Sequence, residues 1–465
     1  MSQDISNIEP ARRGDAVDDA ELLADQPATK KDVKFVLMDR GLLVRRVAEL
    51  VVVAVVVAGA AFVSGRLPSR TVMPAVQPAT AGVNMACPWV GSNSGVLAGA
   101  TGSPATLTPD RGAPQTLNGP VFSAPLAASS TLVGHGSLTA TAEFERPGQM
   151  AGATCATPAS DGYLLLDSPD AVVTLTNVDI QDAVLNLSVY GPNGPVDSGT
   201  LIDLKVFSGT TIQLPMSQYA PGTAPIAVRW QNTIGRVVAW AQVDTAAGLD
   251  LVTPTREDTQ IVVPGVPSGL KTILVLTNPA TVRTKARVDT MTPDGRLTVA
   301  GAEEVTIEAG STATIDVSAA AQGGDVGLFV VAEKALAASV WVTAGSDLAS
   351  SSGVPYTQLV SQDRLVMAPA PGRLVLSNAS QAGIRTVVTI TGDEAPDMQI
   401  VTVGPGASLS VPVGVAGLVR VQAGTGLIAS LVTQPDAANG INIMRLPPDT
   451  AWAGVTPVWA EAQPH

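Results

Sequence analysis

Apolar and polar residues alternate with a period of two along much of this chain, which is the pattern of half-buried β-strands. The alternation is plainest after three similar tripeptides, Leu175-Thr176-Asn177, Leu276-Thr277-Asn278 and Leu376-Ser377-Asn378, which are spaced by 101 and 100 residues. In the second copy, charged residues alternate with small or apolar ones from Arg283 to Thr290. This pattern predicts an antiparallel strand with one face on a core and one face in water.

The features after this strand also recur in the same order. A tight turn follows at Pro192-Asn193-Gly194 and at Pro293-Asp294-Gly295, where Asn-Gly and Asp-Gly supply turn geometry, and a weaker turn follows at Gly392-Asp393. Three further short strands complete each copy. In the last strand we align three residues as equivalent: Trp240, Trp341 and Leu431.

The repeat predicts an all-β fold. Six or seven short strands in each ~90–100 residues, without a helical pattern between them, indicate an immunoglobulin-like β-sandwich. A β-propeller with two four-stranded blades per repeat is the alternative. We therefore expect three tandem sandwiches, at 163–255, at 256–347, and at 348–465 with a C-terminal return strand at Gly454 to Ala460.

The recurring asparagine, Asn177, Asn278 or Asn378, admits a functional and a structural interpretation. Asparagine caps turns by hydrogen bonding to nearby backbone groups. We favour this structural role.

The region before the repeats predicts a membrane anchor. Residues 1–34 are polar and mixed in charge, which is typical of a disordered cytoplasmic tail. Within the juxtamembrane and transmembrane segment 35–65, an apolar run from Leu50 to Gly65 approaches the length of a bilayer span, and it is preceded by more basic residues than follow it. We expect residues 44–65 to lie in the plasma membrane, with the N-terminus cytoplasmic and the bulk of the chain extracytoplasmic. A cleaved signal peptide is the alternative.

A stalk at 66–85 leads to a segment, 86–162, that carries Cys87 and Cys155, the only two cysteines of the chain. Both lie on the predicted outer side, where an oxidising compartment favours a disulfide. Because the segment between them is rich in Gly, Ser, Thr and Ala, we expect a disulfide-closed β and loop region. It is either a degenerate sandwich or a cap on the first repeat.

Composition narrows the function classes. The formal net charge is -13 and no basic patch is visible, which argues against a nucleic-acid partner. Aromatic residues make up 3% of the chain, which weakens the case for a carbohydrate-stacking groove. The cores must therefore consist of Val, Leu, Ile and Ala.

Candidate chemistry is sparse. His135 is the one histidine besides the terminal His465, and nothing near it indicates a catalytic triad. We assign no catalytic, cofactor or metal residues. Asp167, Asp170, Asp179 and Asp182 form a cluster that suits either calcium or, as we prefer, a solvated acidic rim. Two carboxylates acting on a glycosidic bond remain possible in principle.

With these features assembled, the chain resembles an actinobacterial family of uncharacterised single-pass membrane proteins, domain-of-unknown-function family 5719. The resemblance rests on Ala86-Cys87-Pro88 after the predicted span, on Cys155, and on the repeated strand-Asn, Pro-x-Gly and Gly-Ser-Thr blocks, and it covers roughly residues 45 to 460. The family implies no activity or catalytic residues. Its genes often neighbour a large glycosyltransferase, which implies work on envelope glycans.

These observations favour a non-catalytic, membrane-anchored, extracytoplasmic binding or scaffold protein of the bacterial cell envelope. An accessory role in surface-glycan assembly or export is the function we consider first. The expected partners are an envelope glycosyltransferase or transporter, or wall polysaccharide. The alternative is a wall-polysaccharide hydrolase that uses paired carboxylates.

Overall fold

The computed structural model describes residues 82–91, 95–197, 199, 201–392, 395–434 and 440–450. In these ranges the chain is all-β, with three short 3-10 turns between its strands. The described residues contain no helix long and apolar enough to cross a bilayer. The predicted span at 44–65, the cytoplasmic tail and the return strand from Gly454 to Ala460 lie outside them.

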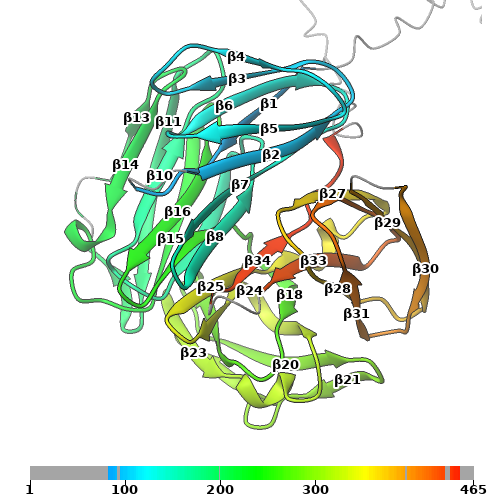
Figure 1. The fold of residues 1–465 in the computed structure, drawn as a ribbon. Helices are drawn as coiled ribbons and strands as arrows, with labels where there is room; N and C mark the ends of the chain where they lie inside the picture. The colour runs from blue at the N-terminus through cyan, green and yellow to red at the C-terminus, as the bar shows by residue number, and fades with distance from the viewer. Residues whose placement is uncertain are drawn as a thin grey trace, which may run out of the picture. The chain divides into compact units, whose positions relative to one another are not determined.

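Four two-sheet units follow one another along the chain (Figure 1). Unit 1 has sheets β1-β6-β3-β4 and β5-β2-β7-β8. Its strands are β1 (Gly82–Cys87), β2 (Gly95–Thr101), β3 (Ala105–Pro109), β4 (Gln115–Leu117), β5 (Val121–Leu126), β6 (Ser130–His135), β7 (Leu138–Arg146) and β8 (Gln149–Thr154).

Unit 2 has sheets β9-β15-β11-β12, with β13 also on β11, and β14-β10-β16-β17. The strands are β9 (Asp161–Leu166), β10 (Val172–Thr176), β11 (Ala183–Gly191), β12 (Gly194–Val196), β13 (Leu204–Val206), β14 (Thr211–Pro215), β15 (Ile226–Ile234), β16 (Val238–Thr245) and β17 (Gly248–Val252), with the turn η1 (Met216–Gln218) after β14.

Unit 3 repeats this topology with one long strand, β24, that runs through both sheets and joins them. Its elements are β18 (Asp258–Val266), β19 (Lys271–Asn278), β20 (Thr284–Thr292), β21 (Gly295–Thr298), β22 (Val305–Ile307), β23 (Ser311–Asp316), η2 (Ser318–Ala321), β24 (Val326–Ala344), β25 (Asp347–Ser352), β26 (Val354–Pro355) and η3 (Tyr356–Gln358).

Unit 4 has sheets β27-β32-β29-β30 and β31-β28-β33-β34. The strands are β27 (Gln362–Ala368), β28 (Gly372–Asn378), β29 (Ile384–Thr391), β30 (Asp397–Val403), β31 (Ser408–Val413), β32 (Gly417–Ala423), β33 (Leu427–Thr433) and β34 (Asn442–Arg445). Each unit has strands whose alternate residues face a hydrophobic cluster, as the period of two predicts. Other strands, such as β17, β25 and β33, are buried along their whole length.

The structural role of the recurring asparagine is confirmed in three units. The fully buried Asn278 donates from Nδ2 to the carbonyls of Val282, Ile307 and Glu308, at 2.8, 3.2 and 3.0 Å. Its Oδ1 accepts from the backbone N–H of Ala280 at 3.1 Å. Asn177 and Asn378 make the same kinds of bond. One amide side chain thus satisfies the backbone at the junction of three segments.

Asn278→Ala is expected to lower the free energy of unfolding by about 3 kcal/mol, because several buried backbone groups lose their partners. Denaturant unfolding of the full-length protein in detergent would measure the loss. Asn193→Ala, at an exposed turn position, is the matched control and should cost much less. Equal losses in both variants would contradict the capping role.

The segment expected as a β and loop region, either a degenerate sandwich or a cap, has more regular strands than expected: unit 1 has eight strands and the same sheet orders as unit 4. Thr101 takes the place of the asparagine: its N–H bonds the carbonyl of Pro120, as Asn378 N–H bonds that of Ala407. Its hydroxyl accepts from the N–H of Ser103, two residues on. Gly99 stands where the other units have leucine, because the Phe122 ring fills that space and would lie 2.2 Å from an added Cβ.

The alignment of Trp240, Trp341 and Leu431 is wrong. Trp240 pairs with Thr174, one residue before the leucine of its tripeptide, whereas Trp341 pairs with Ile273, three residues before. Leu431 pairs with Leu374, two residues before. A shift by one residue turns a side chain to the other sheet face. The three residues therefore occupy three different positions.

The four units contact one another in a closed ring. Strand β9 contacts β24, β18 contacts β33, and β27 contacts β7, so that unit 4 returns to unit 1. One strand near the end of each unit, β8, β17, β25 or β34, contacts the corresponding strand of both neighbouring units around the ring axis (Figure 1).

Three of the seams between units are hydrophobic and one is polar. Trp240 of unit 2 joins the cluster of unit 1, Trp341 joins that of unit 2, and Val432 joins that of unit 3. Among the described residues no hydrophobic cluster spans units 4 and 1. There, Ser137 Oγ donates to Asp449 Oδ1 and Leu138 N donates to Thr450 Oγ1, both at 2.7 Å.

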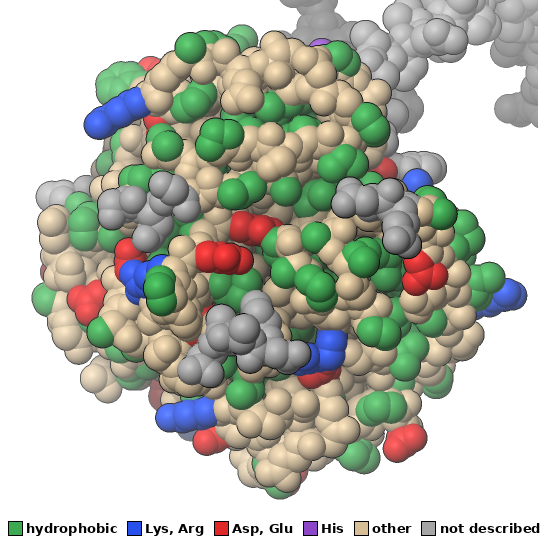
Figure 2. Space-filling view, viewed as in Figure 1, with side chains coloured by type: hydrophobic (Ala, Val, Ile, Leu, Met, Phe, Trp, Pro, Cys, Tyr) green, Lys and Arg blue, Asp and Glu red, His purple; other side chains and the backbone are tan. Residues whose placement is uncertain are grey.

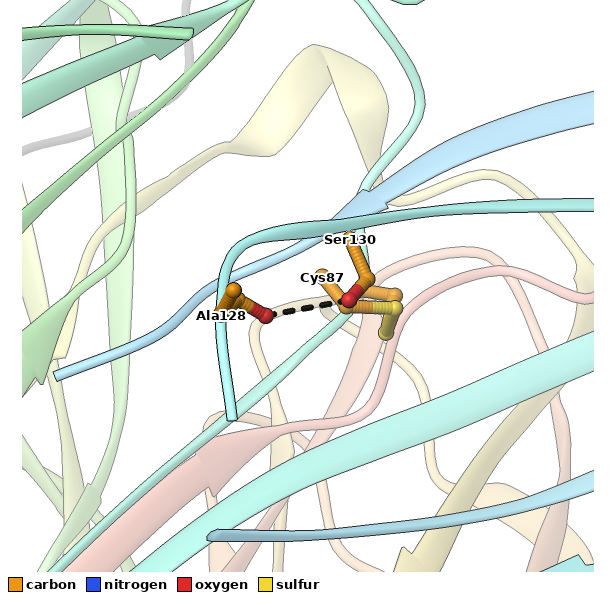
Figure 3. Close-up of a disulfide and its surroundings, with 4 residues drawn as sticks. Cys87, Ala128 and Ser130 are labelled. Atoms are coloured by element: carbon orange, nitrogen blue, oxygen red, sulfur yellow. Dashed lines mark hydrogen bonds between the residues drawn. A yellow bond between two sulfur atoms is a disulfide. The ribbon is translucent and has the colours of Figure 1, made fainter. Parts of the chain in front are cut away.

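The predicted disulfide between Cys87 and Cys155 is present in unit 1. It joins the end of β1 to the residue that follows β8, across a sequence separation of 68 residues. Beside it, Ser130 Oγ donates to the carbonyl of Ala128 at 3.0 Å (Figure 3). The bond therefore fixes the first and last strands of unit 1 and the segment next to them.

Candidate functional site

Charged side chains on the face shown in Figure 2 are scattered among hydrophobic and neutral ones. The candidate sites lie on the ring axis and in three cavities.

Asp347 lies on the ring axis and connects all four units. This buried residue begins β25 of unit 3. Its carboxylate accepts backbone N–H bonds from Met150 of unit 1 at 3.0 Å, Leu249 of unit 2 at 3.1 Å and Ile441 of unit 4 at 2.9 Å. Burial raises the pKa of Asp347, and these backbone bonds oppose the rise. One carboxylate thus provides acceptors for three backbone N–H groups near the starts of β8, β17 and β34, which is a structural role.

Asp250 is a second buried carboxyl beside the axis, and its side chain is 2% exposed. Ser350 Oγ of unit 3 donates to Asp250 Oδ2 at 2.5 Å. Burial raises the pKa of Asp250 to about 8, and the negative charges of Asp347 and Asp167 add to the rise. At neutral pH the carboxyl is therefore largely protonated.

The raised pKa of Asp250 predicts a stability that falls with rising pH. The folded state holds a proton that an unfolded carboxyl releases above about pH 4. The contribution of Asp250 to the free energy of unfolding is complete below about pH 4 and is lost as the pH rises through 8. From pH 6 to pH 8 we expect a decrease in the free energy of unfolding on the order of 2 kcal/mol from this group.

Urea denaturation at several pH values would measure this dependence. Asp250→Asn should flatten the slope, since an amide does not titrate in this range. Asp294→Asn, at an exposed turn, should leave it unchanged. If the Asp250 variant keeps the same slope, other groups must cause the pH dependence of stability.

A cavity of about 350 Å³, the Trp89 cavity, lies at the seam between units 1 and 2. It is lined by Trp89, Asp110, Arg111, Ala127, Ala128, Ser129, Thr211 and Gln213. Burial raises the pKa of Asp110, while a hydrogen bond with Thr211 and the charge of Arg111 oppose the rise. Trp89 follows Cys87 by two residues, so the disulfide anchors the end of β1, just before the segment that carries Trp89. One aromatic ring with a few convergent polar groups is the usual composition of a small-ligand site.

The residues singled out in the sequence do not form one site. Asp179 pairs with Arg236 at 3.0 Å and Asp182 with Lys205 at 2.8 Å, as a solvated rim would. Asp167 and Asp170 lie after β9, and surrounding protein raises the pKa of Asp167 to about 6. His135 ends β6 at an exposed position. No group of three or more His, Cys, Asp or Glu able to hold a metal occurs among the described residues.

Comparison with known proteins assigns the chain to a family. The model of the family of unknown function DUF5719 matches residues 125–414, which extend from unit 1 into unit 4. The chain belongs to the DUF5719 family. No curated protein matches it.

Two solved structures resemble this DUF5719 protein weakly. They are titled "Structure of PNGF-II in P21 space group" and "Structure of PNGF-II in C2 space group". Each shares 8% sequence identity with it and covers 77% of its chain, and the matches span 96% and 95% of the two structures. The TM-score is 0.12 for both, which is too low to support an argument about fold or function.

A second cavity of this DUF5719 protein, the Arg445 cavity, has a volume of about 130 Å³. Its lining comes from units 2, 3 and 4 and the links between them: Ala159, Asp161, Trp230, Pro254, Thr255, Arg256, Gly353, Pro355, Gln358 and Arg445. A third cavity, of about 360 Å³, is lined by residues of unit 4 that include Asp363 and Arg385.

Among the described residues, a single carboxylate lines each of these three cavities: Asp110, Asp161 or Asp363. A glycosidase needs two carboxyl groups about 5–10 Å apart across the scissile bond. None of these cavities supplies such a pair from its lining.

Proposed function

We propose that this chain is a non-catalytic, membrane-anchored, extracytoplasmic binding or scaffold protein of the bacterial cell envelope. We place its anchor at residues 44–65, with the N-terminus in the cytoplasm and the ring outside. An accessory role in the assembly or export of a surface glycan is the specific function that we propose.

The disulfide supports the extracytoplasmic location. Disulfides persist in oxidising compartments and are rare in a reducing cytoplasm. Both cysteines of the chain are used in the bond between Cys87 and Cys155.

The Trp89 cavity is the observation that carries the binding function. Its ring, carboxylate, guanidinium and amide, from Trp89, Asp110, Arg111 and Gln213, converge on a space large enough for part of a sugar or a short peptide. Units 1 and 2 both contribute to it, so the ring architecture determines its shape. We further propose that the four units are immunoglobulin-like modules, given their size and paired sheets.

Affinity capture from detergent-solubilised envelope, with the full-length protein as bait, tests this function. A version that ends at residue 65 is the control for capture through the tail and anchor. We expect the full-length bait to enrich a glycosyltransferase or a transporter. The combined variant Asp110→Asn and Arg111→Gln should lose that partner, whereas the matched change Arg385→Gln in unit 4 should keep it.

A partner retained by the version that ends at residue 65 would contradict a role for the outer part. If neither bait captures a protein, the full-length chain should be incubated with wall glycans. Binding without product would then assign the cavity to polysaccharide. Release of shortened chains would replace the proposal by the paired-carboxylate hydrolase.

A further inference from the structure

Arg445 is a half-buried cation without a counter-charge among the described residues. It ends β34, the strand of unit 4 nearest the ring axis, and lines the Arg445 cavity. Among the described residues, its guanidinium has neither a hydrogen-bond acceptor nor an ion-pair partner. Burial lowers its pKa to about 10, so that it remains protonated at neutral pH. Even partial burial of a charge is unfavourable when no partner compensates its lost hydration.

The remaining charges of the cavity do not compensate Arg445. Asp161 is already paired with Arg256, with Nη2 and Oδ1 3.6 Å apart. The neighbouring Arg364 is also cationic and is close enough for Arg445 to lower its pKa. Arg364 is 3% exposed, and its Nε and Nη2 have no acceptor within the described ranges. The cavity and its surroundings therefore carry a net positive charge.

A second donor accompanies the guanidinium. Trp230 is 1% exposed, lines the same cavity, and its indole Nε1 has no acceptor in the described part of the chain. At the seam of units 3 and 4, by contrast, Arg373 Nε lies 2.6 Å from Asp325 Oδ2. In the Arg445 cavity, which Asp161 and Gln358 also line, the Arg445 guanidinium and the Trp230 indole have no such partner among the described residues.

We propose that the Arg445 cavity binds a small oxyanion, either a carboxylate or a phosphate group. A guanidinium presents two parallel N–H donors that match such an anion. The volume of about 130 Å³ exceeds what a single water needs, so the group has room to enter. The anion is either a free ion or the charged substituent of a larger molecule, such as a uronic acid. This inference does not depend on membrane anchoring.

Thermal unfolding of the full-length protein in detergent tests the proposal. Inorganic phosphate, acetate and glucuronate are titrated separately at constant ionic strength, with chloride as the reference. We expect at least one of them to raise the Tm saturably, by about 2–4 °C. A response to phosphate alone assigns a phosphate site, and a larger response to glucuronate than to acetate assigns a sugar acid.

Arg445→Met should abolish the shift. In chloride alone the variant should unfold at the same or a higher temperature, because an uncompensated charge is gone. Arg445→Lys keeps the charge without the paired donors and should weaken the apparent affinity about tenfold or more. Arg236→Met, which alters an exposed ion pair, should retain the full shift.

Three outcomes would overturn the proposal. One is the absence of any saturable shift over chloride in the unaltered protein. Another is an equal shift in Arg445→Met, which would place the anion elsewhere. The third is a large loss of stability of both Arg445 variants in chloride, which would assign the arginine to packing.

Discussion

Asp347→Ala is expected to lower the free energy of unfolding by about 5 kcal/mol, the largest effect of any single substitution considered. The carboxylate accepts N–H bonds from Met150, Leu249 and Ile441, each in a different unit. Alanine would leave three buried N–H groups without an acceptor, and each such group costs ~1–3 kcal/mol. Denaturant unfolding of the full-length protein, followed by circular dichroism, would measure the loss.

Asp347→Asn keeps the shape of the side chain but reduces its hydrogen-bond acceptors, so it separates these two contributions. Its amide keeps one acceptor oxygen, so an intermediate loss is expected. Asp294→Ala at the exposed turn is the control and should change stability little. If Asp347→Ala costs less than about 1 kcal/mol, then water replaces the carboxylate and the axis is less tightly closed than we infer.

Removal of the disulfide is expected to cost about 4 kcal/mol. Closing a loop of 68 residues restricts the unfolded chain, and the chain-entropy model gives a stabilisation of this size. The double variant Cys87→Ala and Cys155→Ala should therefore unfold at a markedly lower denaturant concentration. Because the bond also anchors the strand before Trp89, the variant should capture its partner less efficiently.

A reducing agent provides the matched comparison. It should destabilise the unaltered protein to about the level of the double variant and leave the double variant unchanged. A reductant effect of equal size on both would indicate an action away from Cys87 and Cys155.

Much of the fold could be predicted because its signals are local. Strand alternation and the turn at Pro293-Asp294-Gly295 depend on neighbouring residues. The asparagine could be interpreted because Asn278 bonds the backbone of its own unit. The disulfide followed from Cys87 and Cys155 being the only cysteines.

Unit 1 was not predicted as a complete unit because its sequence departs at the informative positions. Thr101 stands in place of the asparagine and Gly99 in place of the leucine, while Phe122 fills the core from another strand. The spacing of Thr101 from Asn177 differs from the ~100-residue period of the other copies. A glycine in place of the leucine, opposite a phenylalanine, is a sequence signal that could have revealed unit 1 as a further copy.

The ring and its sites could not be predicted because they depend on contacts across units. Nothing near Asp347 in the sequence indicates that three other units donate to it. Arg445 resembles any strand-end arginine until units 2 and 3 enclose it. The Trp89 cavity likewise needs Thr211 and Gln213 from the next unit.

The closed ring constrains how such a chain can change by gene duplication. In an open array of repeats, an added copy merely extends the row. Here the last unit returns to the first through Asp449 and Thr450, which bond Ser137 and Leu138. A fifth copy would separate these partners and would also add a strand terminus that Asp347 cannot reach. We therefore expect the copy number to stay at four while loops and cavity linings diverge, so that new binding properties arise by substitution and not by lengthening.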